Sequence, residues 1–162
     1  MKTQKKEFLQ MLSAYQGIIH KVNLIYFPVR EDREDNFQEV VMHMWKAYPG
    51  LKEMDKIASW IYAVAINTSI SKIRKDSRYV FKESIESGFT HTLEANIEES
   101  IDFQHLLDAI RQLKEIDRSI MLLYMEDYSY NEIAEIIGIN SSNVGARINR
   151  AKKQLEKRLK TK

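Results

Sequence analysis

The segment 128–155, YSYNEIAEIIGINSSNVGARINRAKKQL, contains the clearest local signals in the chain. Ser129 and Glu132 have the spacing of a capping box, in which each side chain accepts a hydrogen bond from the backbone amide of the other residue at the start of a helix. Gly138 suits the left-handed conformation that ends many helices, and Asn140 is a favoured N-cap for a second helix. The segment therefore predicts a short helix, a turn and a longer helix, which is a helix-turn-helix.

The second helix of this pair, expected over residues 141–160, has one apolar face. At roughly 100° per residue, Ile148, Ala151 and Leu155 fall within about 40° of Val144. We expect these four side chains to pack against the rest of the domain.

The opposite face of the same helix carries small, amide-bearing and basic side chains: Ser142, Asn143, Ala146, Asn149, Arg150 and Lys153. Such side chains suit base edges and phosphates in a DNA major groove. Ala146 can touch a thymine methyl, Asn149 can pair with adenine, and Arg150 can bind guanine through two hydrogen bonds. The pattern therefore favours a DNA-reading helix over an ordinary solvated basic face.

The net charge of +2 conceals an uneven distribution of charge. Residues 141–162 hold eight basic side chains against a single acid, whereas residues 83–110 hold seven acids and no Lys or Arg. The basic C-terminal segment suits DNA phosphates, which would repel the acidic middle segment. Within the basic segment we expect Lys152, Lys157 and Arg158 to contact phosphates.

Three amphipathic helices are predicted in the N-terminal half. Apolar residues recur at steps of three and four from Phe8 to Tyr26 and again from Phe37 to Tyr48, and a proline follows each stripe. Asp55 is a candidate N-cap for the third helix. These helices have facing apolar sides, which is enough for a small bundle.

Residues 83–101 are polar and acidic and lack sustained periodicity, so we expect a flexible linker that lets the flanking domains separate. Helical periodicity restarts at Phe103, and Asp117 is a candidate N-cap for a further helix. The predicted fold is all-α: a three- to four-helix bundle in residues 1–82, the acidic linker, and a helix-turn-helix domain in residues 102–162.

Composition disfavours several functional classes. The chain has no cysteine, which rules out disulfides, thiol catalysis and cysteine-ligated zinc. Its four histidines are scattered over different predicted elements without metal-ligand spacing, so we expect neither an enzyme nor a cofactor. No stretch approaches the roughly 20 apolar residues of a membrane span, and the N-terminus lacks the features of a signal peptide. We therefore expect a cytoplasmic protein without membrane insertion.

Three segments resemble motifs of the extracytoplasmic-function sigma factors, the smallest members of the primary-type bacterial sigma family. Residues 35–41, DNFQEVV, with Trp45, are similar to the family's D-x-x-Q-E-hydrophobic helix. Residues 60–67, WIYAVAIN, are similar to its W-L-x-x-I-A-x-N helix, and residues 128–155 to its S-Y-x-E-I-A and V-x-x-R-I-x-R-A-[KR]-x-x-L pattern. Order and spacing agree, so the resemblance covers nearly the whole chain outside the linker.

The resemblance implies a transcription initiation factor that binds core RNA polymerase, through the clamp helices of the largest subunit and the flap, and directs it to promoter DNA. It also allows for an anti-sigma partner. It implies that the clamp helices are contacted by Asp35, Gln38 and Glu39.

The resemblance further implies two DNA sites. The promoter's minus-ten element would be bound by a specificity loop, residues 49–56, and the helix after it, through Leu51, Lys52, Lys56, Trp60 and Asn67. Asn67 matches the asparagine that holds a flipped-out base. The minus thirty-five element would be read by Ser142, Asn143, Ala146, Arg147, Asn149, Arg150 and Lys153. Gly145 departs from the family pattern, because relatives often carry Arg or Lys there.

One alternative function stays open from the residues alone. A helix-turn-helix regulator with an N-terminal domain for signal input or dimerisation would share the C-terminal pattern. The two N-terminal motifs discriminate between the two functions, because only a sigma factor explains both.

Overall fold

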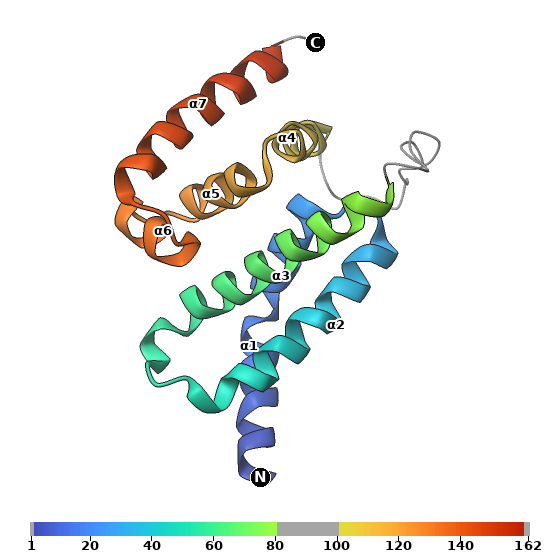
Figure 1. The fold of residues 1–162 in the computed structure, drawn as a ribbon, viewed down its shortest axis with the longest axis vertical. Coiled ribbons are helices and arrows are strands. Elements are labelled where there is room, and N and C mark those ends of the chain that lie inside the picture. The colour runs from blue at the N-terminus through green and yellow to red at the C-terminus, as the bar shows by residue number, and fades with distance from the viewer. Residues whose placement is uncertain (1, 81–100, 161–162) are drawn as a thin grey trace.

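The structure is a computed structural model that describes residues 2–80 and 101–160. The N-terminal half consists of α1 (Lys2–Tyr26), α2 (Arg30–Ala47), two short 3-10 turns, η1 (Tyr48–Gly50) and η2 (Met54–Lys56), and α3 (Ile57–Val80). The C-terminal half consists of α4 (Ile101–Arg111), α5 (Glu115–Met125), α6 (Tyr130–Ile137) and α7 (Ser141–Lys160). Figure 1 shows α1, α2 and α3 below α4 to α7. The all-α prediction is confirmed. The expected linker lies almost entirely outside the described residues.

The apolar stripes of α1, α2 and α3 meet in one core. Ile19, Val22, Val40, Met44 and Ile61 are completely buried there. Burying such a stripe removes apolar surface from water, which stabilises the folded state by about 25 cal/mol per Å². This burial holds the three amphipathic helices together.

A buried polar network links the same three helices. Asn36 Nδ2 of α2 donates to Asn23 Oδ1 of α1 at 2.7 Å and to Ser69 Oγ of α3 at 2.9 Å. Asn23 Nδ2 donates in turn to the carbonyl of Arg33 at 3.1 Å. Buried amides need such partners, so the network fixes how the three helices are positioned relative to one another.

The core of the C-terminal half is built from α5, α6 and α7, with α4 packed against α7. Ile120, Leu123, Ile133, Val144 and Ile148 are completely buried. Helices α6 and α7 both pack against α5, and the buried residues of α7 all lie on one side of that helix.

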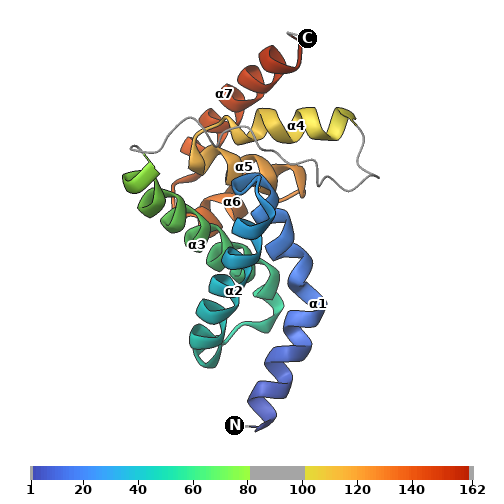
Figure 2. The same ribbon diagram turned by 90° about the vertical axis from the view of Figure 1, so that its right-hand side faces the viewer.

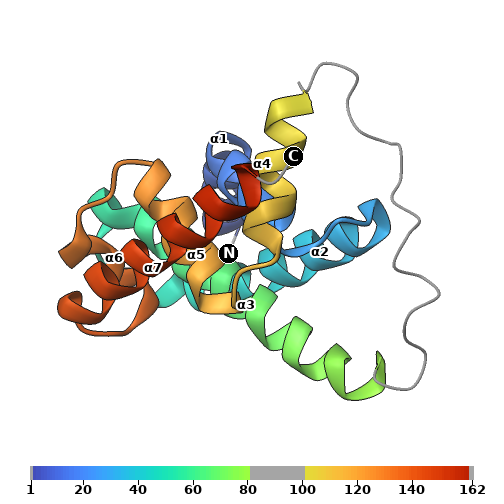
Figure 3. The same cartoon turned by 90° about the horizontal axis from the view of Figure 1, so that it is seen from above.

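The two halves are in direct contact. Helices α4 and α5 pack on α1, and α6 packs on α3. Tyr26 Oη of α1 donates to the carbonyl of Glu115 at 2.6 Å, Arg111 Nε donates to the carbonyl of Leu24 at 2.9 Å, and burial raises the pKa of Tyr26 to about 12. In Figure 2 the first turns of α1 extend away from this contact, and Figure 3 shows α6 and α7 at one side of the molecule with α2 at the other.

Two predicted N-caps are wrong. Asp55 lies inside η2, and α3 begins after it at Ile57. Helix α5 begins earlier than expected, with Lys114 at the N-cap and no side-chain cap bond, so Asp117 lies within its first turn. There the carboxylate of Asp117 accepts a hydrogen bond from Arg147 of α7, a partner distant in sequence.

Candidate nucleic-acid and polymerase interfaces

The helix-turn-helix has the predicted local geometry. The amide of Ser129 donates to Glu132 Oε1 at 2.8 Å, and the amide of Glu132 donates to Ser129 Oγ at 3.1 Å. The first of these bonds lowers the pKa of the Glu132 carboxyl. Gly138 has φ 88°, and Asn140 Oδ1 accepts from the amide of Asn143 at 2.9 Å. The capping box, the glycine turn and the second N-cap are therefore confirmed.

Helix α7 has the two faces that its sequence predicts. Val144, Ile148, Ala151 and Leu155 are buried against the domain. All of the following side chains on the other side are exposed: Ser142, Asn143, Ala146, Asn149, Arg150 and Lys153. A continuous surface of small, amide and guanidinium groups is thus available to a partner, with no bulky apolar residue in it.

Arg147 does not belong to this exposed surface. It lies about 60° from Val144 around the helix, nearer the core side. Its Nη1 donates to Asp117 Oδ1 of α5 at 2.9 Å, and only 28% of its side chain is exposed. The guanidinium of Arg147 thus joins α7 to α5, which favours a structural role over the expected contact with DNA.

The residues expected at phosphates are exposed, and each of them also has a partner within the chain. Lys152 Nζ donates to Tyr124 Oη at 2.7 Å and lies 4.6 Å from the centre of that ring, and the hydrogen bond raises the pKa of Lys152. Arg158 Nη1 donates to Gln112 Oε1. Lys157 is exposed near the end of α7. Lys152 therefore stands beside the aromatic side chains of α5 and α6.

Sequence analysis missed the contact between Tyr130, at the first position of α6, and Gly145 of α7. A Cβ added at Gly145 would lie 3.3 Å from Tyr130 Cε2. The glycine therefore lets α6 and α7 approach closely at this point, and a larger side chain would require the ring of Tyr130 to move. Gly145 thus departs from the family pattern at a point where the ring of Tyr130 leaves little room.

The expected minus-ten residues lie around one end of the N-terminal bundle. Lys52 and Lys56 are exposed, while Leu51 and Trp60 are half-buried against the core. Asn67 is exposed and follows Trp60 by about two turns of α3, so both lie on the same side of that helix. Leu51, Lys52, Lys56 and Trp60 line a cleft of about 770 Å³, which Asn67 does not reach.

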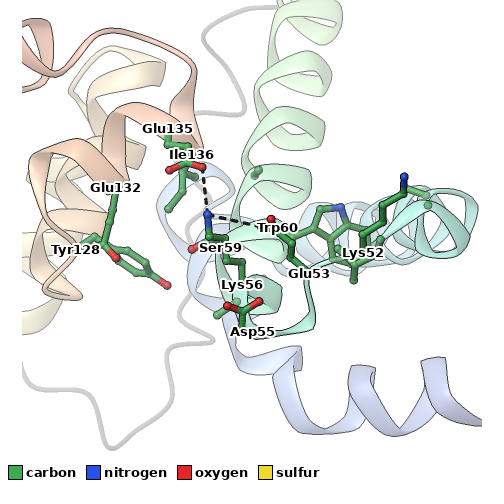
Figure 4. A pocket seen from close by; sticks show the side chains of 15 residues that line it. Lys52, Glu53, Asp55, Lys56, Ser59, Trp60, Tyr128, Glu132, Glu135 and Ile136 are labelled. Carbon is green, nitrogen blue, oxygen red and sulfur yellow. Dashed lines mark ion pairs between the residues drawn. The ribbon is translucent and has the colours of Figure 1, made fainter.

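The opposite wall of this cleft comes from the C-terminal half, through Tyr128, Glu132, Glu135 and Ile136 (Figure 4). Lys56 Nζ lies 3.7 Å from Glu135 Oε1 and 3.6 Å from Glu53 Oε2, and these carboxylates raise the pKa of Lys56. Deeper in the contact, the rings of Tyr62 and Tyr128 meet edge to face, with centroids 5.6 Å apart. Sequence analysis missed this wall, because no local pattern predicts which helix of a second domain will pack there.

The expected polymerase-binding residues share the outer face of α2. Asp35, Gln38 and Glu39 are exposed, whereas Asn36, Val40 and Met44 on the other side are buried. Met42, 50% exposed, lies one turn further along the outer face. The elements that pack against α2 are α1, α3 and η1, and not the helices of the C-terminal half.

The described residues contain neither a metal-holding cluster nor a membrane-spanning helix. In residues 2–80 and 101–160, no group of three or more His, Asp or Glu side chains is arranged to hold a metal ion. No helix in the same ranges is both long and apolar enough to cross a bilayer.

Comparison with known proteins places both halves in one family. Residues 11–79 match the family model for sigma-70 region 2, and residues 103–155 match the model for sigma-70, region 4. The chain is 28% identical to RNA polymerase sigma factor YlaC of Bacillus subtilis (strain 168), over 80% of this chain and 78% of that one. It is 26% identical to RNA polymerase sigma factor SigV of the same organism, over 93% and 90% of the two chains.

Solved structures share the fold. The sigma factor RpoE from Bartonella quintana, in complex with the anti-sigma factor NepR, superimposes with a TM-score of 0.78 at 22% identity, over 96% of this chain and 98% of that one. CnrH, in complex with the cytosolic domain of CnrY, gives a TM-score of 0.65 at 15% identity, over 96% and 88%. Because regions 2 and 4 occur here in order and cover most of the chain, the protein belongs to the sigma-70 family as an extracytoplasmic-function sigma factor, which directs RNA polymerase to specific promoters.

Proposed function

We propose that this sigma factor binds core polymerase, the minus-ten element and the minus thirty-five element through three separate surfaces. The outer face of α2, with Asp35, Gln38 and Glu39, binds the clamp helices of the largest polymerase subunit. Support comes from the exposure of all three side chains and from the position of α2 away from the C-terminal half. Met42 adds an apolar group beside them, and buried apolar side chains supply much of the binding energy in protein interfaces. The C-terminal domain, residues 102–162, contacts the flap.

The second surface binds the minus-ten element. Lys52 and Lys56 suit phosphates of a DNA strand, and the half-buried Trp60 offers an aromatic ring beside them. Asn67, exposed on the same side of α3, holds a base that has left the stack. Together with Leu51 these residues belong to the N-terminal domain, residues 1–82.

The third surface is the exposed side of α7, which reads the minus thirty-five element. The observation that carries this assignment is the separation of the faces: the apolar side of α7 is buried, and small, amide and basic groups occupy the exposed side. Asn149, Arg150 and Ala146 reach base edges, while Lys157 and Arg158 lie further along the helix and contact phosphates. Lys152 joins them by exchanging Tyr124 for a phosphate oxygen.

We also propose that an anti-sigma protein regulates the chain. The similar folds of RpoE and CnrH were solved with the anti-sigma factor NepR and with the cytosolic domain of CnrY, respectively. The protein acts where core polymerase acts, in the cytoplasm.

The test is transcription with purified components. The chain is mixed with core RNA polymerase and a genomic DNA library, and the 5′ ends of the transcripts are sequenced. The proposal expects start sites that share two upstream elements and that disappear when the chain is omitted. Start sites without a shared upstream element would contradict the assignment of α7.

A further inference from the structure

The stretch of α3 that carries Asn67 contains no charged side chain. From Ile57 to Ser71 the sequence holds no Asp, Glu, Lys, Arg or His. At 1.5 Å per residue this neutral stretch is roughly 21 Å long, so a DNA strand lying along it brings several phosphates beside a surface that offers them no cation. A counter-charge beside Asn67 has to come from another helix.

His43 of α2 reaches this neutral stretch. Its Nδ1 lies 2.8 Å from Oγ1 of Thr68, the residue that follows Asn67. Thr68 is buried, whereas His43 and Asn67 are both exposed. The imidazole of His43 therefore borders the surface on which, in the proposed function, Asn67 holds its base.

The bond to Thr68 orients the imidazole without fixing its charge. A hydroxyl both donates and accepts hydrogen bonds, so Thr68 Oγ1 can bond to Nδ1 of the neutral ring and of the protonated ring. In the protonated ring, Nδ1 donates to Thr68 and Nε2 is a second donor, suited to a phosphate oxygen. The ring can thus gain a proton and a phosphate while it keeps its position.

The elements that meet around His43 present other charged or titratable side chains: Glu39 and Lys46 on α2 itself, Lys72 on α3, His20 on α1 and Tyr48 in η1. Glu39 and Lys46 each lie within about one turn of His43 and carry opposite charges. Lys72 follows Thr68 by a full turn of α3. His20 stacks on Phe37, roughly 120° around α2 from His43, and Tyr48 is buried. The proton of His43 itself therefore decides the charge beside Asn67.

We propose that His43 supplies the cation for the minus-ten strand beside Asn67, and that binding of the strand is coupled to uptake of a proton by the imidazole. This inference rests on the assignment of Asn67 and α3 to the minus-ten element in the proposed function.

The coupling makes minus-ten binding depend on pH. Histidine is the side chain whose charge ordinarily changes between about pH 5 and pH 8, whereas lysine and arginine stay charged over this range. A phosphate stabilises the protonated ring, so the complex with DNA holds more protons than the protein without DNA. Affinity for the strand should therefore be highest at the acidic end of this range and fall as the pH rises.

Binding of a single-stranded minus-ten oligonucleotide to the holoenzyme tests the proposal. The strand comes from a promoter found by the start-site experiment and carries a fluorophore. It is titrated near pH 6 and near pH 8, roughly the two sides of the histidine transition, over a series of salt concentrations. The slope of log affinity against log salt is the main readout, because each neutralised phosphate of a single strand contributes about 0.7 to it.

Three substitutions and wild type are compared on the same core enzyme, so the pH dependence of the core is common to all. His43→Gln should show neither the affinity gain nor the steeper slope at low pH. Relative to it, wild type should bind about three- to fivefold more tightly near pH 6, with a slope steeper by about 0.7, and about equally near pH 8. His43→Arg should keep the tighter binding and the steeper slope at both pH values, because a guanidinium stays charged.

His20→Gln is the matched control, because it removes another exposed histidine of the same domain. It should keep the full pH dependence of wild type. Affinity and salt slope that change with pH no more in wild type than in His43→Gln would overturn the proposal. So would a loss in His43→Gln of affinity for core polymerase alone, with strand binding unchanged, because His43 would then belong to the polymerase-binding face beside Glu39.

A failure of the proposed function gives a different result. If wild-type holoenzyme prefers the minus-ten strand over a scrambled strand and Asn67→Ala weakens this preference, while His43→Gln and wild type respond alike to pH, only the role of His43 is wrong. If wild-type holoenzyme binds both strands equally, the minus-ten assignment itself has failed.

Discussion

Arg147 of α7 and Asp117 of α5 are joined by a hydrogen-bonded ion pair of 2.9 Å, with 28% and 17% of their side chains exposed. A partly buried pair of this kind is worth more than a surface pair, because water screens it less. It fixes the long α7 to the helix that supports it, close to the side chains that we assign to DNA.

Arg147→Ala should therefore destabilise the C-terminal domain without changing the promoter sequence that is selected. We expect a loss of about 1 to 2 kcal/mol in the free energy of unfolding, since the carboxylate of Asp117 keeps its burial and loses its partner. Denaturant unfolding of Arg147→Ala, Asp117→Asn and the double variant measures the coupling. Fully additive losses in the free energy of unfolding would show that the pair contributes nothing. An altered promoter preference in Arg147→Ala would show that Arg147 contacts DNA.

The capping box predicts a pH dependence of stability. The bond from the Ser129 amide lowers the pKa of Glu132 below its ordinary value of 4.5 in the folded state. A lowered folded-state pKa means that the contribution is present above the unfolded-state pKa and is lost as the pH falls through the folded-state value. Wild type should thus lose more stability on acidification than Glu132→Gln. Parallel pH curves for the two proteins would contradict this. Ser129→Ala should cost about 1 kcal/mol at neutral pH.

The sequence predicts features that depend on neighbouring residues better than contacts between segments that are distant in the sequence. The capping box, Gly138 and the two faces of α7 involve residues within a few turns of one another, and all were predicted. Asp117 satisfies the same local preference for an N-cap, yet its side chain is held by Arg147 from another helix. Lys56 was expected at DNA because its loop matches the family's specificity loop, and nothing near it in sequence indicates Glu135. The surroundings of Asp117 and Lys56 are set by contacts between segments that are distant in the sequence. A local sequence pattern does not reveal such contacts.

Gly145 offers a test of the close approach between α6 and α7. Alanine has the higher helix propensity by about 1 kcal/mol, but its Cβ would lie 3.3 Å from the ring of Tyr130. Gly145→Ala should therefore stabilise the domain by less than the propensity predicts. In a Tyr130→Ala background the same substitution should give the full gain. Thermal unfolding of the four proteins completes the cycle, and equal gains in both backgrounds would mean that the ring moves aside without cost.

Asn67→Ala tests the minus-ten assignment. Asn67 is exposed on α3 and outside the cleft, so its loss should leave folding and binding to core polymerase unchanged. Promoter opening should slow, because a lost hydrogen bond to the flipped base costs on the order of 1 kcal/mol. Opening is followed with a fluorescent base at the minus-ten element, and a template already melted there should rescue the variant only in part. Opening kinetics equal to those of wild type would show that Asn67 does not bind the minus-ten element.

Alanine substitutions at two basic residues of α7 should impair promoter binding in different ways. Arg150 lies on the exposed side with Asn149 and Ala146, so Arg150→Ala should cost about 1 to 3 kcal/mol and relax sequence preference at one upstream position. Lys157 lies about two turns further along the helix, so Lys157→Ala should weaken all sites alike and reduce the slope of log affinity against log salt by about one.

Transcription from a library randomised across the upstream element, run with each holoenzyme at two salt concentrations, distinguishes these two losses. Because α7 is buried on its apolar side from Val144 to Leu155, only its opposite side can face DNA. If Lys157→Ala changes the selected sequence and Arg150→Ala leaves it untouched, the C-terminal end of α7 enters the groove, and the assignment of Ala146, Asn149 and Arg150 to base edges is wrong.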